Sequence, residues 1–245
     1  MKNDLKLYSN QKTMEQKEDL IQLWNHYPNF FPSSWYQPLY EELKDKVTGY
    51  TSTYNGKNYA SKRISCFFVD TSGLNIVDSE RIKEISSEEK EESPIAKEIN
   101  EIFETAVQKV DARSQYFSYA RLPAFDWKES EMISKIHFNV ELKLKTNYDY
   151  CLCHIYRDGK DEINWHADRE SLNLDIASVS FGACRKFRLR TKDKTKGHDF
   201  EYNLGSGDLF HMLEGCQKVY KHCVPKESTV KEPRINLTFR KYDTL

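Results

Sequence analysis

Three residues in the second half of the chain have the types and spacing of a metal site: His166, Asp168 and His222. His166 and Asp168 are two positions apart in a run typical of a strand, so their side chains leave the same face and can reach one ion. His222 lies in another strand-like run. Two imidazoles and one carboxylate cover one face of an octahedron and leave the other positions open, as in non-haem iron(II) oxygenases. The His-x-Asp pair alone is weak evidence for a metal site, because a chain with seven histidines and 38 acidic residues can contain such a pair by chance.

Polar residues on the last strand-like run, RINLTFR, could bind a ligand at those open positions. Arg234, Asn236 and Arg240 alternate with apolar residues and therefore share one face. A guanidinium grips a carboxylate through two parallel hydrogen bonds, which a lysine cannot do. An ordinary strand with one solvated face would show the same pattern. Two arginines around an amide, beginning twelve residues after His222, favour a site for a dicarboxylate.

Two neighbouring runs carry polar residues on one face as well. His154 and Tyr156 share a face of CLCHIY, and Asn164 lies on the face of His166 and Asp168. Inward polar residues on several strands predict a lined cavity.

The elements that must position these residues are short strands. From about residue 148 the chain alternates apolar and polar residues in the runs CLCHIY, INWHAD, IASVSF, KFRLR, DLFHM, VYKHCV and RINLTFR. Turn residues separate them at Asp158-Gly159, Gly205-Ser206-Gly207 and Glu214-Gly215. This pattern predicts an antiparallel sandwich or jelly roll.

The first half reads mainly as helices. Apolar spacing predicts one helix around Leu20, Leu23 and Trp24, and others over 35–47, 95–110 and 128–144. Ser33 and Ser34 are capping candidates for the second, and the last should turn Ile133, Ile136 and Val140 inward. A short strand is expected over Ile64–Val69. Helices followed by strands make the chain α+β.

Composition limits the remaining choices. A formal charge of −1 excludes bulk electrostatics as the means of holding nucleic acid, so such a contact needs a local basic patch. The basic run from Arg185 to Lys196 is either that patch or a solvated face. The sequence shows no membrane-spanning run and no apolar signal-peptide core near its start, which predicts an intracellular chain. Cys151, Cys153, His154, Cys216 and Cys223 match no common zinc spacing, so buried thiols are expected.

Several motifs in order resemble one known family. The runs YRDGKDEINWHADRE, IASVSFGACRKFRLR, GDLFHMLEGCQKVYKHCVPK and EPRINLTFR are similar to the AlkB family of 2-oxoglutarate dioxygenases, nearest the homologues that demethylate nucleic-acid bases. The resemblance covers 148–240, with weaker similarity at 62–70 and 116–127. The segment 71–109 has no counterpart.

The resemblance implies a double-stranded β-helix (jelly roll) core with N-terminal helices packed on it. We therefore expect a helical extension over 1–60 and a dioxygenase domain over 61–245, with a substrate lid at about 61–146 and the jelly-roll core at about 147–245.

The resemblance also implies roles for individual residues. His166, Asp168 and His222 would bind Fe(II), Arg240 would lie near the metal-chelating end of 2-oxoglutarate, and its distal carboxylate would be held by Arg234, Asn236 and Tyr156. His154 stands where the family usually has asparagine. Glu170 occupies the position of a carboxylate that faces the substrate base, and Tyr119 or Phe117 would stack on that base.

The activity implied is oxidative demethylation of N-alkylated bases, such as 1-methyladenine and 3-methylcytosine, in DNA or RNA. It would consume Fe(II)-activated O2 and 2-oxoglutarate and release formaldehyde, succinate and CO2. The expected protein is a monomer in the nucleus or cytoplasm that binds methylated nucleic acid and no membrane. Two alternatives remain: the same oxygen chemistry on a protein or small molecule, and a non-catalytic jelly-roll binding module.

Overall fold

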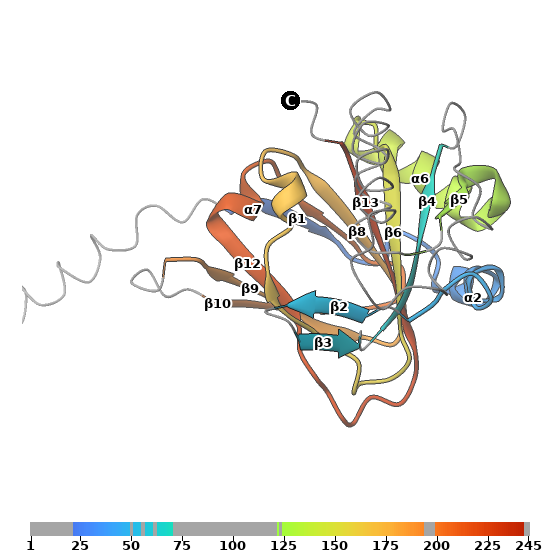
Figure 1. The fold of residues 1–245 in the computed structure, drawn as a ribbon. Helices are drawn as coiled ribbons and strands as arrows, with labels where there is room; N and C mark the ends of the chain where they lie inside the picture. Colours follow the sequence, from blue (N-terminus) through green and yellow to red (C-terminus); the bar gives the residue numbers. More distant parts are fainter. Residues whose placement is uncertain are drawn as a thin grey trace, which may run out of the picture.

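Two β-sheets form the centre of the protein (Figure 1). The computed structural model describes residues 22–49, 51–54, 57–60, 63–70, 122, 124–193 and 199–242. The predicted helix at 95–110 and the aromatic residues Phe117 and Tyr119 lie outside these ranges. Within them, no helix is long and apolar enough to cross a membrane.

The larger sheet has seven strands in the order β1-β11-β8-β13-β6-β4-β5. In chain order these are β1 (Trp24–Tyr27), β4 (Ile64–Val69), β5 (Ala124–Asp126), β6 (Tyr150–Tyr156), β8 (Ile176–Gly182), β11 (Leu209–Met212) and β13 (Arg234–Arg240). All pairs are antiparallel except β4 with β5. The prediction of a strand at Ile64–Val69 is confirmed.

The smaller sheet has the order β10-β9-β12-β7. Its strands are β7 (Ile163–His166), β9 (Arg185–Thr191), β10 (Asp199–Leu204) and β12 (Tyr220–Val224), and a separate hairpin joins β2 (Thr51–Tyr54) to β3 (Lys57–Ala60). From β6 to β13 the chain crosses repeatedly between the two sheets. This topology is the predicted jelly roll, and together with the helices it gives the predicted mixed fold.

Strand alternation divides the large sheet into two chemically different faces. On β13, Ile235, Leu237 and Phe239 are fully buried in the core under the helices. Arg234 and Arg240 alternate with them and face the smaller sheet. The space between the sheets therefore receives the polar side chains.

Two helices cover the apolar face (Figure 1). α6 (Glu131–Leu144) buries Ile133, Ile136 and Val140, as predicted. It begins three residues later than expected, because the side chain of Ser130 accepts a hydrogen bond from the amide of Ile133 and caps the helix there.

The other helix, α2 (Tyr36–Leu43), buries Leu39 and Leu43. A short 3-10 turn, η2 (Ser33–Trp35), precedes it. The prediction that Ser33 or Ser34 caps this helix is wrong, because the cap positions are Pro32 and Trp35 and neither makes a side-chain capping bond.

The prediction of a helix around Trp24 is also wrong. Residues Trp24–Tyr27 form β1, which pairs with β11 at the edge of the large sheet. Trp24 is 1% exposed, its ring lies 4.8 Å from that of Phe200, and its Nε1 donates to the hydroxyl of Tyr202. Two or three apolar residues at helical spacing do not exclude a strand when the partner strand lies far along the chain.

Within the predicted extension, residues 22–49 thus add a strand to the large sheet and a helix to its cover, and the hairpin of β2 and β3 follows them. The boundary at residue 60 and the lid over 61–146 remain predictions. β10 was not predicted from the sequence, because its residues before the buried Leu204 alternate only between exposed and half-buried.

Ser130→Ala should destabilise the fold without touching the space between the sheets. Ser130 caps α6 and also donates to Glu42 Oε2, so its hydroxyl joins the two segments. Loss of a cap costs about 1 to 2 kcal/mol, which for a chain of this size lowers the melting temperature by about 2 to 8 °C. Thermal unfolding monitored by circular dichroism measures this. Ser228→Ala, in an exposed loop, is the control; equal melting temperatures for the two variants would contradict the role of Ser130.

Candidate active site

The structure brings His166, Asp168 and His222 together. β12 pairs with β7 so that His222 lies directly opposite His166, and their ring centroids are 4.2 Å apart. The Nε2 atoms of both histidines lie 3.7 Å from oxygens of Asp168. One nitrogen or oxygen from each residue lies within 4.8 Å of the others, which is the convergence that a single metal ion requires.

The protonation of these groups suits a cation. His166 Nδ1 lies 2.7 Å from the carbonyl oxygen of Asn164 and donates to it, which leaves the Nε2 lone pair facing Asp168. Burial, reinforced by His166, lowers the pKa of His222 to about 3, so that imidazole is neutral near pH 7. A neutral imidazole binds a metal without first losing a proton.

The Asp168 carboxylate is buried and charged. Burial alone would raise its pKa, but Arg240, His222 and His166 outweigh burial and lower it to about 2. Its Oδ2 atom is buried with no hydrogen-bond partner among the described residues. A buried carboxylate oxygen without a donor is costly, and a metal ion would compensate it.

Two further residues fix the position of Asp168. Its backbone N–H donates to Gln217 Oε1 at 3.0 Å, and the amide of Gln217 in turn donates to Met212 Sδ. Arg240 Nη2 lies 3.1 Å from Asp168 Oδ1, and Nη1 of the same guanidinium pairs with Glu170. Arg240 therefore lies beside the candidate metal ligands, and its place near the chelating end of 2-oxoglutarate stays a prediction.

Arg234 has hydrogen-bond donors to spare. Its side chain is 1% exposed, and Nη2 donates to Ser180 Oγ at 2.9 Å. Nε and Nη1 are buried without a hydrogen-bond partner in the described part of the chain. Its guanidinium lies 5.2 Å from the ring centroid of Tyr156, its register partner on β6. Burial lowers the pKa of Arg234, as expected for a cation with no adjacent carboxylate. These donors fit a carboxylate ligand.

Arg185 differs from Arg234 in the hydrogen bonds of its guanidinium. It is equally buried and lies over Tyr156 as well. Its guanidinium, however, bonds to Glu227 Oε2 and to three carbonyl oxygens, those of Asp158, Asp161 and Pro225. Arg185 is satisfied by the protein itself, which makes it a structural arginine.

His154 and Asn236 lie opposite each other on β6 and β13. Asn236 Nδ2 donates to Ser178 Oγ and to the carbonyl of Val179. His154 Nδ1 lies 2.6 Å from Ser65 Oγ. Burial, with Arg63 and Arg240, lowers the pKa of His154 well below its usual value. A neutral imidazole whose Nδ1 accepts from Ser65 carries a proton on Nε2 and keeps the donor that an asparagine would supply.

Several residues that support the site were not predicted from the sequence. Ser178 and Ser180 share the polar face of β8, and the period of two in IASVSF could have revealed them. Gln217 lies on a four-residue helix, α7 (Cys216–Val219), and no sequence signal marked it. Glu170 lies where the sequence placed it, after Asp168, but it is paired with Arg240.

The cysteines form no competing metal site among the described residues, whose one convergent group of three ligands is His166, Asp168 and His222. All but Cys184 are buried. The expectation of thiols packed in the core is confirmed for the rest.

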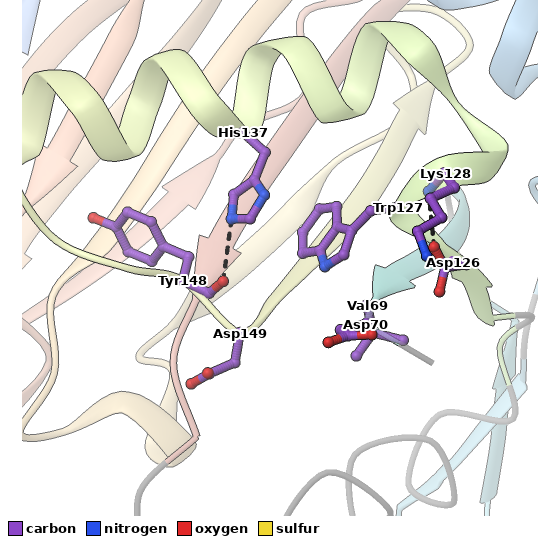
Figure 2. Close-up of a pocket in the computed structure, with 8 residues that line it drawn as sticks. All are labelled: Val69, Asp70, Asp126, Trp127, Lys128, His137, Tyr148 and Asp149. Atoms are coloured by element: carbon purple, nitrogen blue, oxygen red, sulfur yellow. Dashed lines mark hydrogen bonds between the residues drawn. The ribbon is translucent and has the colours of Figure 1, made fainter. Parts of the chain in front are cut away.

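A separate pocket of about 450 Å³ lies on the helix side of the large sheet. Figure 2 shows Trp127 and His137 in this pocket; their rings stack at 4.1 Å, and His137 Nε2 lies 3.1 Å from the carbonyl of Tyr148. None of the predicted site residues lines it. His137 also stacks on Phe239, which points away from the metal ligands, so this pocket and the site occupy opposite faces of the sheet.

The chain is similar in sequence to known proteins. A sequence model of the 2OG-Fe(II) oxygenase superfamily matches residues 24–240. Alpha-ketoglutarate-dependent dioxygenase alkB homolog 3 of Homo sapiens is 42% identical over 103 residues, 38% of this chain and 36% of that protein. The DNA oxidative demethylase ALKBH2 of Bos taurus is 35% identical over 119 residues, 45% of this chain and 43% of that protein. The solved structure of OsALKBH1 aligns with 91% of this chain and all of its own, with a TM-score of 0.48 and 15% identity.

The chain thus spans about two fifths of the length of the AlkB homologues it matches. The family match is far wider and contains the three metal-ligand candidates, Arg234 and Arg240. On that match the chain belongs to the 2OG-Fe(II) oxygenase superfamily, which works with Fe(II), 2-oxoglutarate and O2.

Proposed function

We propose that the protein is an oxidative demethylase of N-alkylated bases in DNA or RNA. The observation that carries this proposal is the similarity to AlkB homolog 3 and to a protein named DNA oxidative demethylase, in a chain that retains the complete His-Asp-His group. Fold and metal set alone do not choose a substrate, so the relatives supply the substrate class. We also propose that the protein acts as a monomer in the nucleus or cytoplasm.

His166, Asp168 and His222 would hold Fe(II). With 2-oxoglutarate and O2 the bound iron supplies the oxidising power that hydroxylates a methyl group, and the hydroxymethyl base then releases formaldehyde. Arg234, beside Tyr156, would receive the distal carboxylate of 2-oxoglutarate through Nε and Nη1, which bond to no other residue in the described part of the chain. Arg240 would lie near the chelating end, because it already contacts Asp168.

The substrate base must leave its stack, because a methyl group inside a duplex cannot reach a metal between two sheets. Glu170 lies two residues after Asp168, on η4 (Arg169–Ser171), and is paired with Arg240 beside the site. We propose that it faces the base while it is shared with Arg240. The stacking role of Tyr119 or Phe117 stays a prediction.

Asp168→Ala should abolish turnover. The variant removes the one anionic ligand, and even an outer-shell partner is worth about ten- to a hundredfold in metal affinity. We expect loss of at least about a hundredfold in Fe(II) affinity with retained circular dichroism. Consumption of 2-oxoglutarate and equilibrium metal binding measure the two effects. Glu162→Ala, on the same stretch of chain, is the control; wild-type turnover in the Asp168 variant would remove the metal assignment.

Arg234→Ala should weaken 2-oxoglutarate binding by roughly thirtyfold to several thousandfold, because removing one partner of a buried charge pair costs about 2 to 5 kcal/mol. Arg185→Lys should instead lower the melting temperature, since its hydrogen bonds are internal, and leave affinity nearly unchanged. Calorimetric titration with 2-oxoglutarate separates the two arginines. Affinity within about twofold of wild type in Arg234→Ala would contradict its role.

Cationic lesions should be the better substrates. Methylation at a pairing nitrogen of adenine or cytosine adds positive charge and leaves the base unpaired, which lowers the cost of flipping it. We expect 1-methyladenine and 3-methylcytosine to be demethylated faster than neutral methylated bases, and Glu170→Gln to narrow the difference. Formaldehyde release and mass spectrometry of oligonucleotides that carry each lesion measure this. Release from no methylated DNA or RNA, beside robust oxidation of a peptide or small molecule, would refute the proposed function.

A further inference from the structure

Four cations on and beside the smaller sheet lack a carboxylate partner among the described residues: Arg169, Arg190, Lys192 and Lys221. Arg190 and Lys221 are register partners on the adjacent strands β9 and β12. Lys221 and Arg169 both lie close enough to Lys192 to add to burial in lowering its pKa. Arg169 and Lys192 are exposed, and the other two are half-buried. We call these four residues the outer basic surface.

This surface differs from the basic run in the sequence. Within that run, Arg185 is buried and satisfied internally. Lys186 and Arg188 are both paired with Glu201 on β10, at 3.1 and 2.5 Å. Three of the run's cations are therefore already paired with two carboxylates, those of Glu227 and Glu201, whereas Arg169 and Lys221 come from elsewhere in the chain.

Trp165 orders part of the surface. The Arg190 guanidinium lies 4.1 Å from the Trp165 ring centroid, a cation–π contact that orients the side chain without neutralising its charge. Asp199 faces Arg190 in the register, yet no ion pair joins them among the described residues. The Arg190 charge thus stays available to an external anion.

The outer basic surface is tied to the metal site by the chain itself. Trp165 precedes His166, Arg169 follows Asp168, and Lys221 precedes His222. Neighbouring residues on a strand point to opposite faces, so the ligands point between the sheets while Trp165 and Lys221 point outward. β7 is the edge strand of the smaller sheet, so a flexible polymer can pass over that edge from the outer surface toward the site.

We propose that the outer basic surface binds the phosphates of single-stranded nucleic acid on one side of the substrate base. The inference rests on the proposed function and adds the path of the nucleic-acid strand over the protein surface. A polyanion is the partner whose charge complements this surface. The net charge of the chain, −1, supplies no general attraction for a polyanion, so the attraction must come from local cations such as these. A single strand suits the site, since its bases need no unpairing before they enter.

The test is fluorescence anisotropy of a labelled, unmodified oligothymidylate titrated at several salt concentrations. Each phosphate contact on a single strand contributes about −0.7 to the slope of log affinity against log salt concentration. Four contacts therefore predict a slope of about −3. Replacing Arg169, Arg190 and Lys221 together by alanine should bring the slope to about −1 and weaken binding by more than about tenfold.

The control replaces Lys128, Lys135 and Lys143 by alanine. These exposed lysines lie on or beside α6, on the helix side of the molecule, and their loss changes the net charge equally. Affinity for 2-oxoglutarate and the melting temperature verify that both variants fold.

Equal slopes for the two triple variants, or no binding of the oligonucleotide by the wild-type protein, would overturn the proposal that the outer basic surface binds phosphates. Absence of demethylation by a wild-type protein that binds the oligonucleotide with the predicted slope would overturn the proposed function instead. The two failures are therefore distinguishable.

Discussion

One ion pair between the two sheets governs the site: Arg240, the last residue of β13, contacts Asp168, which follows β7. The guanidinium holds the carboxylate ionised in a buried setting, where burial alone would favour the neutral acid. Because Asp168 is also held by Gln217, its oxygens remain between His166 and His222. The convergence of the three candidate metal ligands thus depends on how the two sheets meet.

The remaining buried charges follow the same logic. Arg185 is bonded to Glu227 and to three carbonyl oxygens, whereas Arg234, equally buried, keeps two donors that bond to none of the residues the structure describes. Buried charges are tolerated when they are paired and costly when they are not. A buried guanidinium whose Nε and Nη1 bond to no described residue can bind an anion, and 2-oxoglutarate is the anion that the family uses. The neutral state of His154 is consistent with this arrangement, because a further positive charge there would face both arginines.

The strands that carry the site were predictable because a period of two is visible in short runs. RINLTFR and CLCHIY show which residues share a face, whereas the antiparallel pairing of β13 with β6 is visible only in the structure. The convergence of His222 on His166 was less accessible, since it depends on a pairing between strands more than fifty residues apart. Trp24 was misassigned for the same reason: its environment is set by β11 and by rings on β10 and β12, which local spacing cannot reveal. Gln217 accepts a hydrogen bond from the backbone N–H of Asp168 only because the fold brings the two together, and its sequence neighbours give no sign of this role.

The most direct test of the central claim is a crystal structure of the protein with Mn(II), an inert substitute for Fe(II), and 2-oxoglutarate. The account predicts one anomalous peak bounded by His166, Asp168 and His222, with the distal carboxylate of 2-oxoglutarate on Arg234 Nε or Nη1. Metal bound at another group of residues, or 2-oxoglutarate bound away from Arg234, would contradict it.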